Sequence, residues 1–197
     1  NPKARIITDN PHYPIVPKSW IYTPLSSLAD IKSAKRVMKS DWKNCGIPFY
    51  RTREIVRLSK DGYVDNELFI SQNLYDEYKE KYGVPIAGDI MLTAVGTIGD
   101  TYIVTPKDVF YYKDASVLCL HPRTIIYSDF LSILFSVPFL QKQMKNNSKG
   151  TTVDTITIEK ASTYICPLPP LEEQKRIVCK IEEMYSILDE IETSLQS

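Results

Sequence analysis

The longest regular pattern of apolar residues lies at the C-terminal end of the chain. In the final 27 positions, apolar residues follow one another in alternating steps of four and three, at Ile177, Ile181, Met184, Leu188, Ile191 and Leu195. This spacing is the seam of a coiled coil rather than the wider apolar stripe of an ordinary surface helix. Pro170 suits the first helical turn, and Glu172 and Glu173 lie where the helix dipole favours anions. The pattern predicts a helix of about 26 residues, roughly 39 Å long.

The residues before this helix alternate between short apolar segments and turn signals, which is typical of short strands and helices. A strand is expected over residues 20–23, followed by a short helix with Pro24 in its first turn. The segment GIPFYRTREIV, residues 46–56, reads as a buried strand that runs into a basic turn at residues 51–53. Residues 67–83 start extended and then form a helix from about Gln72 to Lys81, which Gly83 closes.

Further along, two apolar runs joined around Gly96 and Gly99 predict a β-hairpin over residues 88–106. A further strand is expected within residues 112–122. Residues 128–148 are helical but interrupted at Val137, because the residue before Pro138 is pushed out of the helical region. Residues 152–168 begin with alternating apolar positions and then become extended towards the prolines.

These elements predict an α+β fold with one long helix at its end. Four prolines break up an irregular arm at residues 1–17, a mixed domain of short strands and helices covers residues 18–168, and the long helix occupies residues 169–197. The mixed domain does not need a helix of that length to close its own core. We therefore expect the helix to project, the alternative being a helix that folds back on its own domain.

Composition places the chain among ordinary globular proteins of the cytoplasm. It is 43% hydrophobic and 24% charged, and no apolar run is long enough for a membrane span. The four cysteines lack CxxC spacing, which argues against a zinc site, and a disulfide framework is not expected in a chain this long. The chain begins with Asn rather than Met, so we expect it to start inside a longer gene product or at a cloning boundary.

A net charge of zero conceals a strong asymmetry. Residues 32–60 hold nine basic and two acidic side chains, a balance of +7, whereas residues 171–196 hold seven acidic and three basic side chains, a balance of −4. Two oppositely charged regions suggest two surfaces with different partners. The alternative is that each is merely a solvated face.

Signals of catalysis are weak. His12 and His121 lie beside prolines, and no nucleophile motif accompanies them, so we expect structural roles rather than a Cys–His or Ser–His dyad. The GTIG sequence at residues 96–99 resembles the GXXG clamp of KH modules, but strands flank it, which favours a hairpin. The Glu77–Tyr78–Lys79 triplet lies in a polar helix, where a nuclease metal site is not expected.

Nucleic-acid binding is the better hypothesis. The basic segment interleaves its cations with Trp42, Phe49 and Tyr50, and a second polar, basic loop covers residues 141–152. Cations neutralise phosphates, while Arg and Asn side chains read guanine and adenine edges. The expected contact residues are Lys35, Arg36, Lys39, Lys43, Arg51, Thr52, Arg53, Asn146, Asn147 and Lys149. Seven of them are expected on one concave surface, namely Lys35, Arg36, Lys39, Arg51, Arg53, Asn146 and Lys149.

Three segments in this order resemble the target-recognition domains of type I restriction–modification specificity subunits. They are GIPFYRTREI at residues 46–55, AGDIMLTAVGTIGDTYIV at residues 87–104, and the stretch that begins GTTV at residue 150 and contains PLPPLEEQKRIV. The resemblance covers roughly residues 18–197. Its most specific piece is PLPPLEEQ entering the long helix, whereas GTIG alone is weak.

The resemblance implies a DNA reader with no catalytic residues of its own. Each such domain reads one half of a split target on double-stranded DNA, and a long helix pairs antiparallel with a second one to hold two domains at a fixed distance. Modification subunits dock on this scaffold with S-adenosylmethionine, and a restriction subunit brings ATP-driven cleavage with Mg²⁺. No cofactor is expected in this chain itself.

The chain departs from the family pattern in having one domain and one long helix where full-length subunits have two of each. We expect either a fragment or a half-subunit that dimerises, with the six seam residues as its pairing surface. The alternative from another class is an adaptor module that binds no DNA and acts through its coiled-coil helix.

Overall fold

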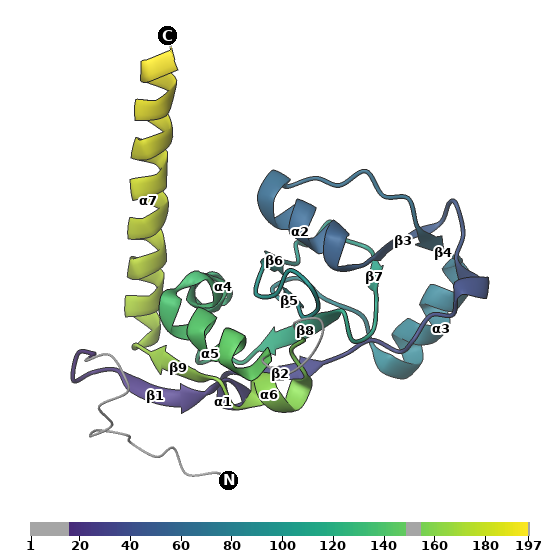
Figure 1. Cartoon of the computed structure of the whole chain (residues 1–197), viewed down its shortest axis with the longest axis horizontal. Coiled ribbons are helices and arrows are strands. Elements are labelled where there is room, and N and C mark those ends of the chain that lie inside the picture. The colour runs from purple at the N-terminus through teal and green to yellow at the C-terminus, as the bar shows by residue number, and fades with distance from the viewer. Residues whose placement is uncertain (1–15, 149–154, 197) are drawn as a thin grey trace.

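The computed structural model describes residues 16–148 and 155–196. They form a mixed α/β domain from which one long helix extends (Figure 1). Within these residues, no helix is both long enough and apolar enough to cross a membrane. The predicted arm at residues 1–17 lies almost wholly outside the described part of the chain.

Nine strands and a set of mostly short helices make up the described residues. The strands are β1 (Ile21–Pro24), β2 (Ala29–Lys32), β3 (Ile47–Tyr50), β4 (Phe69–Ile70), β5 (Ile90–Thr93), β6 (Thr101–Ile103), β7 (Tyr111–Tyr112), β8 (Val117–Pro122) and β9 (Ile165–Leu168). The helices are α1 (Leu25–Leu28), the 3₁₀ turn η1 (Lys39–Asp41), α2 (Thr52–Asp61), α3 (Gln72–Tyr82), α4 (Ser128–Ser136), α5 (Pro138–Ser148), α6 (Ile158–Ser162) and α7 (Leu171–Gln196).

An antiparallel sheet in the order β2-β8-β5-β6 is the centre of the domain. Successive side chains on a strand point to opposite faces. Ile90, Leu92 and Leu120 therefore join the core beneath α1, α4, α5 and α6, whereas Met91 and Cys119 join a second core beneath α2. The sheet therefore has a hydrophobic core on each face.

Two smaller sheets complete the fold. The order β4-β3-β7 combines an antiparallel pair with the parallel pair β3–β7, and this sheet packs with α3 around Phe49, Ile70 and Tyr111. Strand β1 pairs antiparallel with β9, with Ile21 opposite Leu168. That pairing brings the start of the domain beside the segment that enters α7 (Figure 1).

Several local predictions are confirmed. Strands β5 and β6 form the predicted hairpin, in which Gly96 and Gly99 hold φ angles of 78° and 92°. Val137 is extended, with ψ of 146°, and separates α4 from α5 as the following proline requires. The helix that Gly83 closes covers Gln72–Tyr82.

The expected basic turn at residues 51–53 is wrong, because the chain enters α2 directly from β3. Arg51 is the N-cap residue, and the Glu54 side chain accepts its backbone N–H at 2.9 Å. Ile55 and Leu58, spaced for one helix face, bury that face against the sheet. The segment forms a helix rather than a turn because the Glu54 carboxylate caps its first turn and because Ile55 and Leu58 give it an apolar face.

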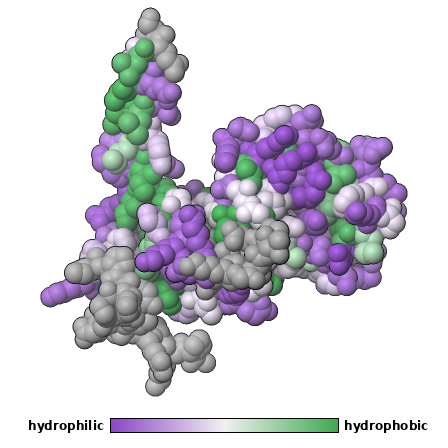
Figure 2. All heavy atoms as spheres, in the orientation of Figure 1, coloured by the Kyte–Doolittle hydropathy of each residue, from purple (hydrophilic) through white to green (hydrophobic). Residues whose placement is uncertain are grey.

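Helix α7 is the predicted 26-residue helix and projects from the domain rather than folding back on it (Figure 1). Its first turns pack on α4, with Val178 buried and Ile177 partly buried against the main core. From residue 182 to residue 195 every side chain is exposed. Figure 2 shows apolar atoms along one side of this projecting part.

Candidate nucleic-acid interface

The turn between β7 and β8, residues 113–116, is where two parts of the basic segment at residues 32–60 meet. The Thr52 hydroxyl donates a hydrogen bond to the Ser116 carbonyl oxygen at 3.1 Å, and the Ala115 amide donates to the Ser33 hydroxyl oxygen at 3.1 Å. Ala115 holds φ at 58°, a left-handed conformation that residues with a Cβ rarely adopt. The turn is therefore held on one side by the start of α2 and on the other by the segment that leaves β2.

Lys35 and Arg36 lie in that second segment. The Lys35 backbone N–H donates to the Tyr111 hydroxyl at 3.0 Å, and its ammonium group lies 5.6 Å from the centre of the Tyr82 ring. The Arg36 guanidinium is 3.9 Å from the Asp114 carboxylate, with the Arg36 side chain 74% exposed. Such a long, exposed contact contributes little to stability, so the Arg36 donors stay available to a ligand.

Arg51 and Arg53 share one acceptor, the fully buried carboxylate of Glu54. Arg51 donates from Nη2 to Oε1 at 2.8 Å and from Nε to Oε2 at 3.1 Å. Arg53 donates from Nε to Oε1 at 2.9 Å, and its Nη2 reaches the Glu67 carboxylate at 2.9 Å. Because a guanidinium carries five N–H donors, both arginines keep unused donors after these contacts.

The pKa of Glu54 is set by two opposing effects. Burial raises it, while hydrogen bonds from the Arg51 side chain and backbone and from Arg53 lower it, and the pKa ends below its usual value. Glu54 is therefore ionised at neutral pH and fixes both guanidinium groups. Sequence reasoning assigned these arginines to DNA alone and missed the carboxylate that orients them, although Glu54 stands three residues after Arg51.

The outer face of α2 adds two basic residues, Arg57 and Lys60, that were not predicted as contact residues. Arg53, Arg57 and Lys60 are exposed and follow one another at helical spacings of four and three. The signal that could have found them is this spacing, which has meaning only once the segment is taken as a helix. With Arg51 partly buried, Arg53 begins this row.

The remaining predicted residues are distributed over three places. Lys39 starts η1 and is exposed, and Lys43 is exposed while its backbone bridges to Phe69. Asn146 is exposed near the end of α5. The Asn147 side chain and Lys149 lie outside the described residues.

The segments that carry most of the predicted contact residues border one end of the central sheet. Thr93 pairs with Val117 there, the Ala94 amide donates to the Ser116 carbonyl at 2.9 Å, and the Ile156 amide donates to the Ala94 carbonyl at 2.8 Å. The hairpin at residues 94–100 touches α5 at the same end, because a Cβ built on Gly99 would stand 2.8 Å from Met144 Cε. The segments 33–36 and 51–53, the hairpin and α5 thus surround one end of the sheet. That their side chains form one concave surface stays a prediction.

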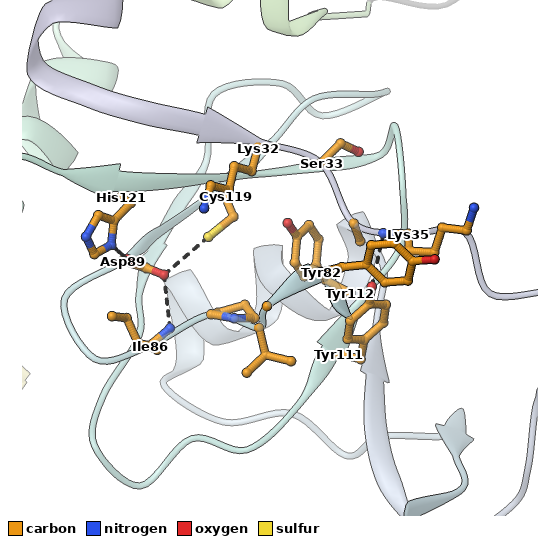
Figure 3. Close-up of a pocket in the computed structure, with 14 residues that line it drawn as sticks. Lys32, Ser33, Lys35, Tyr82, Ile86, Asp89, Tyr111, Tyr112, Cys119 and His121 are labelled. Carbon is orange, nitrogen blue, oxygen red and sulfur yellow. Dashed lines mark hydrogen bonds and ion pairs between the residues drawn. The ribbon is translucent and has the colours of Figure 1, made fainter. Parts of the chain in front are cut away.

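A pocket of about 180 Å³ opens between the central sheet and the β4-β3-β7 sheet, next to Lys35 (Figure 3). Its Asp89 accepts hydrogen bonds from the Ile86 amide at 3.0 Å, the Cys119 thiol at 3.4 Å and His121 Nδ1 at 2.6 Å. Burial, reinforced by the Asp89 charge, raises the pKa of the Cys119 thiol. A protonated thiol that donates to a carboxylate is not an activated nucleophile. The half-exposed His121 side chain is held by the buried Asp89, and its structural role stays a prediction.

The Glu77 carboxylate, considered above for a metal site, lies on α3 and pairs with Lys81 at 2.8 Å. In residues 16–148 and 155–196, no group of three or more His, Cys, Asp or Glu side chains is arranged to hold a metal ion.

Comparison with known proteins places this chain in a family. The sequence profile described as the type I restriction modification DNA specificity domain matches residues 17–197. The chain is 29% identical, over 189 residues, to the type I restriction enzyme EcoBI specificity subunit of Escherichia coli, covering 93% of this chain and 38% of that protein. It is 30% identical, over 175 residues, to a Haemophilus influenzae protein whose name assigns it to the same class, covering 88% of this chain and 40% of that protein. The chain spans about two fifths of the length of these relatives.

Solved structures share the fold. The HsdS subunit from Thermoanaerobacter tengcongensis superposes with a TM-score of 0.65 at 19% identity, covering 92% of this chain and 41% of that one. A chain from a study of complex assembly and conformational transition of the type I R-M system gives a TM-score of 0.66 at 20% identity, covering 92% of this chain and 42% of that one. Because the family profile matches nearly the whole chain, this protein belongs to the type I restriction–modification DNA specificity domain family.

Proposed function

We propose that this chain is a sequence-specific DNA-recognition unit of a type I restriction–modification system, which reads one half of a split target and has no catalytic role. The observation that supports it is the gathering of basic side chains around one end of the central sheet in a chain of this family. The buried Cys119 thiol donates a hydrogen bond to the Asp89 carboxylate, so it is not an activated nucleophile beside the half-exposed His121, which favours a binding role over an enzymatic one.

Two kinds of contact are expected at this surface. Compact ammonium groups and exposed guanidinium groups neutralise phosphates and fix the register of the protein on the duplex. The exposed residues suited to this are Lys35, Arg36, Lys39, Lys43, Arg57 and Lys60. Base edges are read by groups held in a fixed direction. Arg53, held by the buried Glu54 carboxylate but 41% exposed, is the strongest candidate on α2.

Helix α7 supplies the second half of the proposal. Its exposed apolar row needs a partner, and its exposed acidic side chains keep the same helix away from the DNA phosphates. We assign this row to antiparallel pairing with a second α7, from another copy or from the other half of a longer subunit. The paired helices then carry the modification and restriction subunits, which supply S-adenosylmethionine, ATP and Mg²⁺.

Selection from a pool of random duplexes tests the DNA-reading role. The purified chain should enrich one short motif, and sequencing of the methylome of the source organism should show that motif as half of a split methylated target. Affinity for the selected duplex should fall steeply with salt, by a log–log slope of about −0.9 for each phosphate neutralised.

The adaptor alternative gives a different result. An adaptor that acts through α7 would retain α7-dependent self-association yet show neither an enriched motif nor a salt-dependent affinity for duplex DNA. That pair of results would overturn the proposed DNA-reading role.

A further inference from the structure

The side chain of Gln174 is fully buried and all its hydrogen bonds go to the backbone of the domain. Its Oε1 accepts the Tyr127 amide at 2.7 Å. Its Nε2 donates to the Ile125 carbonyl at 3.0 Å and to the Pro169 carbonyl at 2.9 Å. One amide group thus connects α7 to the loop before α4 and to the end of β9.

This connection lies at the base of the projecting helix, where α7 leaves the domain beside α4 (Figure 1). One turn further along, Val178 is buried in the main core. On the preceding residue, Glu173 Oε1 accepts a hydrogen bond from Trp20 Nε1 at 3.1 Å. Beyond residue 181 every described side chain of α7 is exposed. The direction of the whole helix is therefore set by little more than its first three turns.

A helix held only at its base acts as a lever. The roughly 22 residues beyond Gln174 span about 33 Å, so a tilt of about 10° displaces the far end by about 6 Å. A base-pair step is about 3.4 Å, so such a tilt shifts anything carried at that end by more than one step. Apolar packing of Val178 is not directional, whereas three hydrogen bonds from one planar amide are.

We propose that Gln174 is a positioning residue that fixes the angle between the domain and α7. In doing so it sets the distance between the DNA half-sites read by two domains joined through their long helices. The second statement rests on the proposed function, whereas the first concerns this chain alone.

Pulsed electron–electron double resonance on the full chain measures the angle directly. One spin label goes on the native, exposed Cys45 and the other on the projecting helix through Glu190→Cys, with Cys179→Ser to remove the other exposed thiol. Cys119 and Cys166 are buried and are not labelled. Dilution with unlabelled protein removes distances between copies. The wild-type background should give one narrow distance distribution.

Gln174→Met keeps the length of the side chain but removes all three hydrogen bonds. We expect a distance distribution at least about two-fold wider, because ridges-into-grooves packing alone allows helix crossing angles to vary by about 15–20°. Gln174→Ser is the second variant, since its smaller side chain leaves room for water to satisfy the three backbone groups if Gln174→Met fails to fold. An unchanged distance distribution in a folded variant would overturn the proposal that Gln174 fixes the angle of α7.

The chain contains a matched control in Gln143. Its side-chain amide also makes partly buried hydrogen bonds to the backbone, accepting the Ile165 amide at 2.8 Å and donating to the Ile165 carbonyl at 2.9 Å. These bonds join α5 to β9 rather than α7 to the domain. Gln143→Met should lower the melting temperature much as Gln174→Met does and leave the distribution narrow. An equally widened distance distribution in both variants would show that losing either set of hydrogen bonds loosens the whole domain. That result would also overturn the proposed role of Gln174.

The consequence for DNA is tested with duplexes whose half-sites are separated by the native spacer or by one base pair more or fewer. Paired wild-type chains should prefer the native spacer by about ten-fold, and Gln174→Met should reduce that preference while leaving affinity for a single half-site unchanged. If the wild-type chain binds no duplex, the proposed function fails. The spin-label distances still decide whether Gln174 fixes the angle between the domain and α7. A preserved spacer preference in Gln174→Met would refute the role in spacing.

Discussion

The guanidinium of Arg51 and the carboxylate of Glu54 form a bidentate ion pair, with N···O distances of 2.8 and 3.1 Å, at the point where the chain passes from β3 into α2. The same carboxylate also accepts the Arg51 backbone N–H, so one buried acid caps the helix and fixes the arginine. A residue chosen from its sequence as a DNA contact is thereby also part of the folding of α2. Effects of Arg51 variants on DNA binding have to be separated from effects on stability.

Replacing Glu54 with Gln should lower the free energy of unfolding by about 1–3 kcal/mol, because two arginines lose their shared charged acceptor. The pH dependence gives a sharper test. A pKa lowered by folding stabilises the native state above the unfolded value, and this stabilisation is lost as pH falls through the folded value. Urea denaturation from pH 7 to pH 3 should therefore show a steeper loss below about pH 4.5 in wild type than in Glu54→Gln. Parallel curves for the two proteins would contradict this.

Arg57 and Lys60, the last two residues of the exposed row on α2, should contribute charge rather than sequence information, whereas Arg53 should contribute to the reading of bases. Arg57→Ala and Lys60→Ala should weaken binding to selected and random duplexes equally and should each reduce the salt slope by about 1. Arg53→Ala should cost about 1–3 kcal/mol more on the selected duplex than on the random one. Fluorescence anisotropy titrations measure both. Lys175→Ala on α7, which removes a cation far from this surface, serves as the control and should change neither affinity.

Glu67→Gln should strengthen DNA binding. Glu67 is exposed and holds Arg53 Nη2 at 2.9 Å, so its carboxylate both occupies a donor and places a negative charge beside the basic row. Removing that charge should raise affinity about two- to five-fold at low salt and less at high salt, as expected for an exposed group. A loss of affinity would mean that Glu67 orients Arg53 for base contact, and the comparison with Arg53→Ala identifies that case.

The two hairpin glycines should differ in their tolerance of substitution. Both hold positive φ, but Gly96 has open space around it, whereas a Cβ on Gly99 would stand 2.8 Å from Met144 Cε and 3.0 Å from Gln141 Nε2. Gly96→Ala should cost about 1 kcal/mol from backbone conformation alone, and Gly99→Ala about 2–3 kcal/mol because crowding is added. Urea denaturation at neutral pH compares them. Similar losses at both positions would mean that α5 yields easily at this contact.

The local elements were the predictable part of the fold. The hairpin, the break at Val137 and the length of α7 each depend on signals within a few residues of the chain: paired glycines, a proline and a repeated apolar spacing. Helix α2 was missed although its signals were equally local, because the charged triplet at residues 51–53 was read as a turn. Glu54 and the pair Ile55 and Leu58 would have predicted the helix.

What the sequence could not provide is the set of contacts between distant segments. Strands β3 and β7 pair in parallel with Phe49 opposite Tyr111, and neither strand has a pattern that selects the other. Likewise, the PLPPLEEQ motif was recognisable as a helix start, but the partners of Gln174 lie at residues 125 and 127, in a loop with no visible link to it. The same holds for Glu67 beside Arg53.

The apolar row on α7 differs from the predicted seam at its start and in its width. Ile177 is partly buried against the main core and belongs to the base of the helix rather than to the free surface. Tyr185 and Ile187, which flank the seam, are 64% and 49% exposed and widen the row. Pairing should therefore depend on the residues from Ile181 onward, with Tyr185 and Ile187 enlarging the buried area.

Substitution of Leu188, which is 58% exposed in the middle of this row, should abolish self-association. Each large apolar side chain gains about 1.5–3 kcal/mol when fully buried, so a row of this length outweighs the cost of association, and a charge at its centre reverses the balance. Light scattering coupled to gel filtration at tens of micromolar should show a dimer for wild type and a monomer for Leu188→Glu. Ser186→Glu places the same charge on the opposite side of the helix and should remain dimeric. The side chains of residues 182–195 are all exposed in the single chain. Both variants should therefore keep the wild-type melting temperature of the domain when all three proteins are diluted until they are monomeric. A wild-type chain that is monomeric at this concentration would contradict pairing between copies and leave the row to a second long helix of the same subunit.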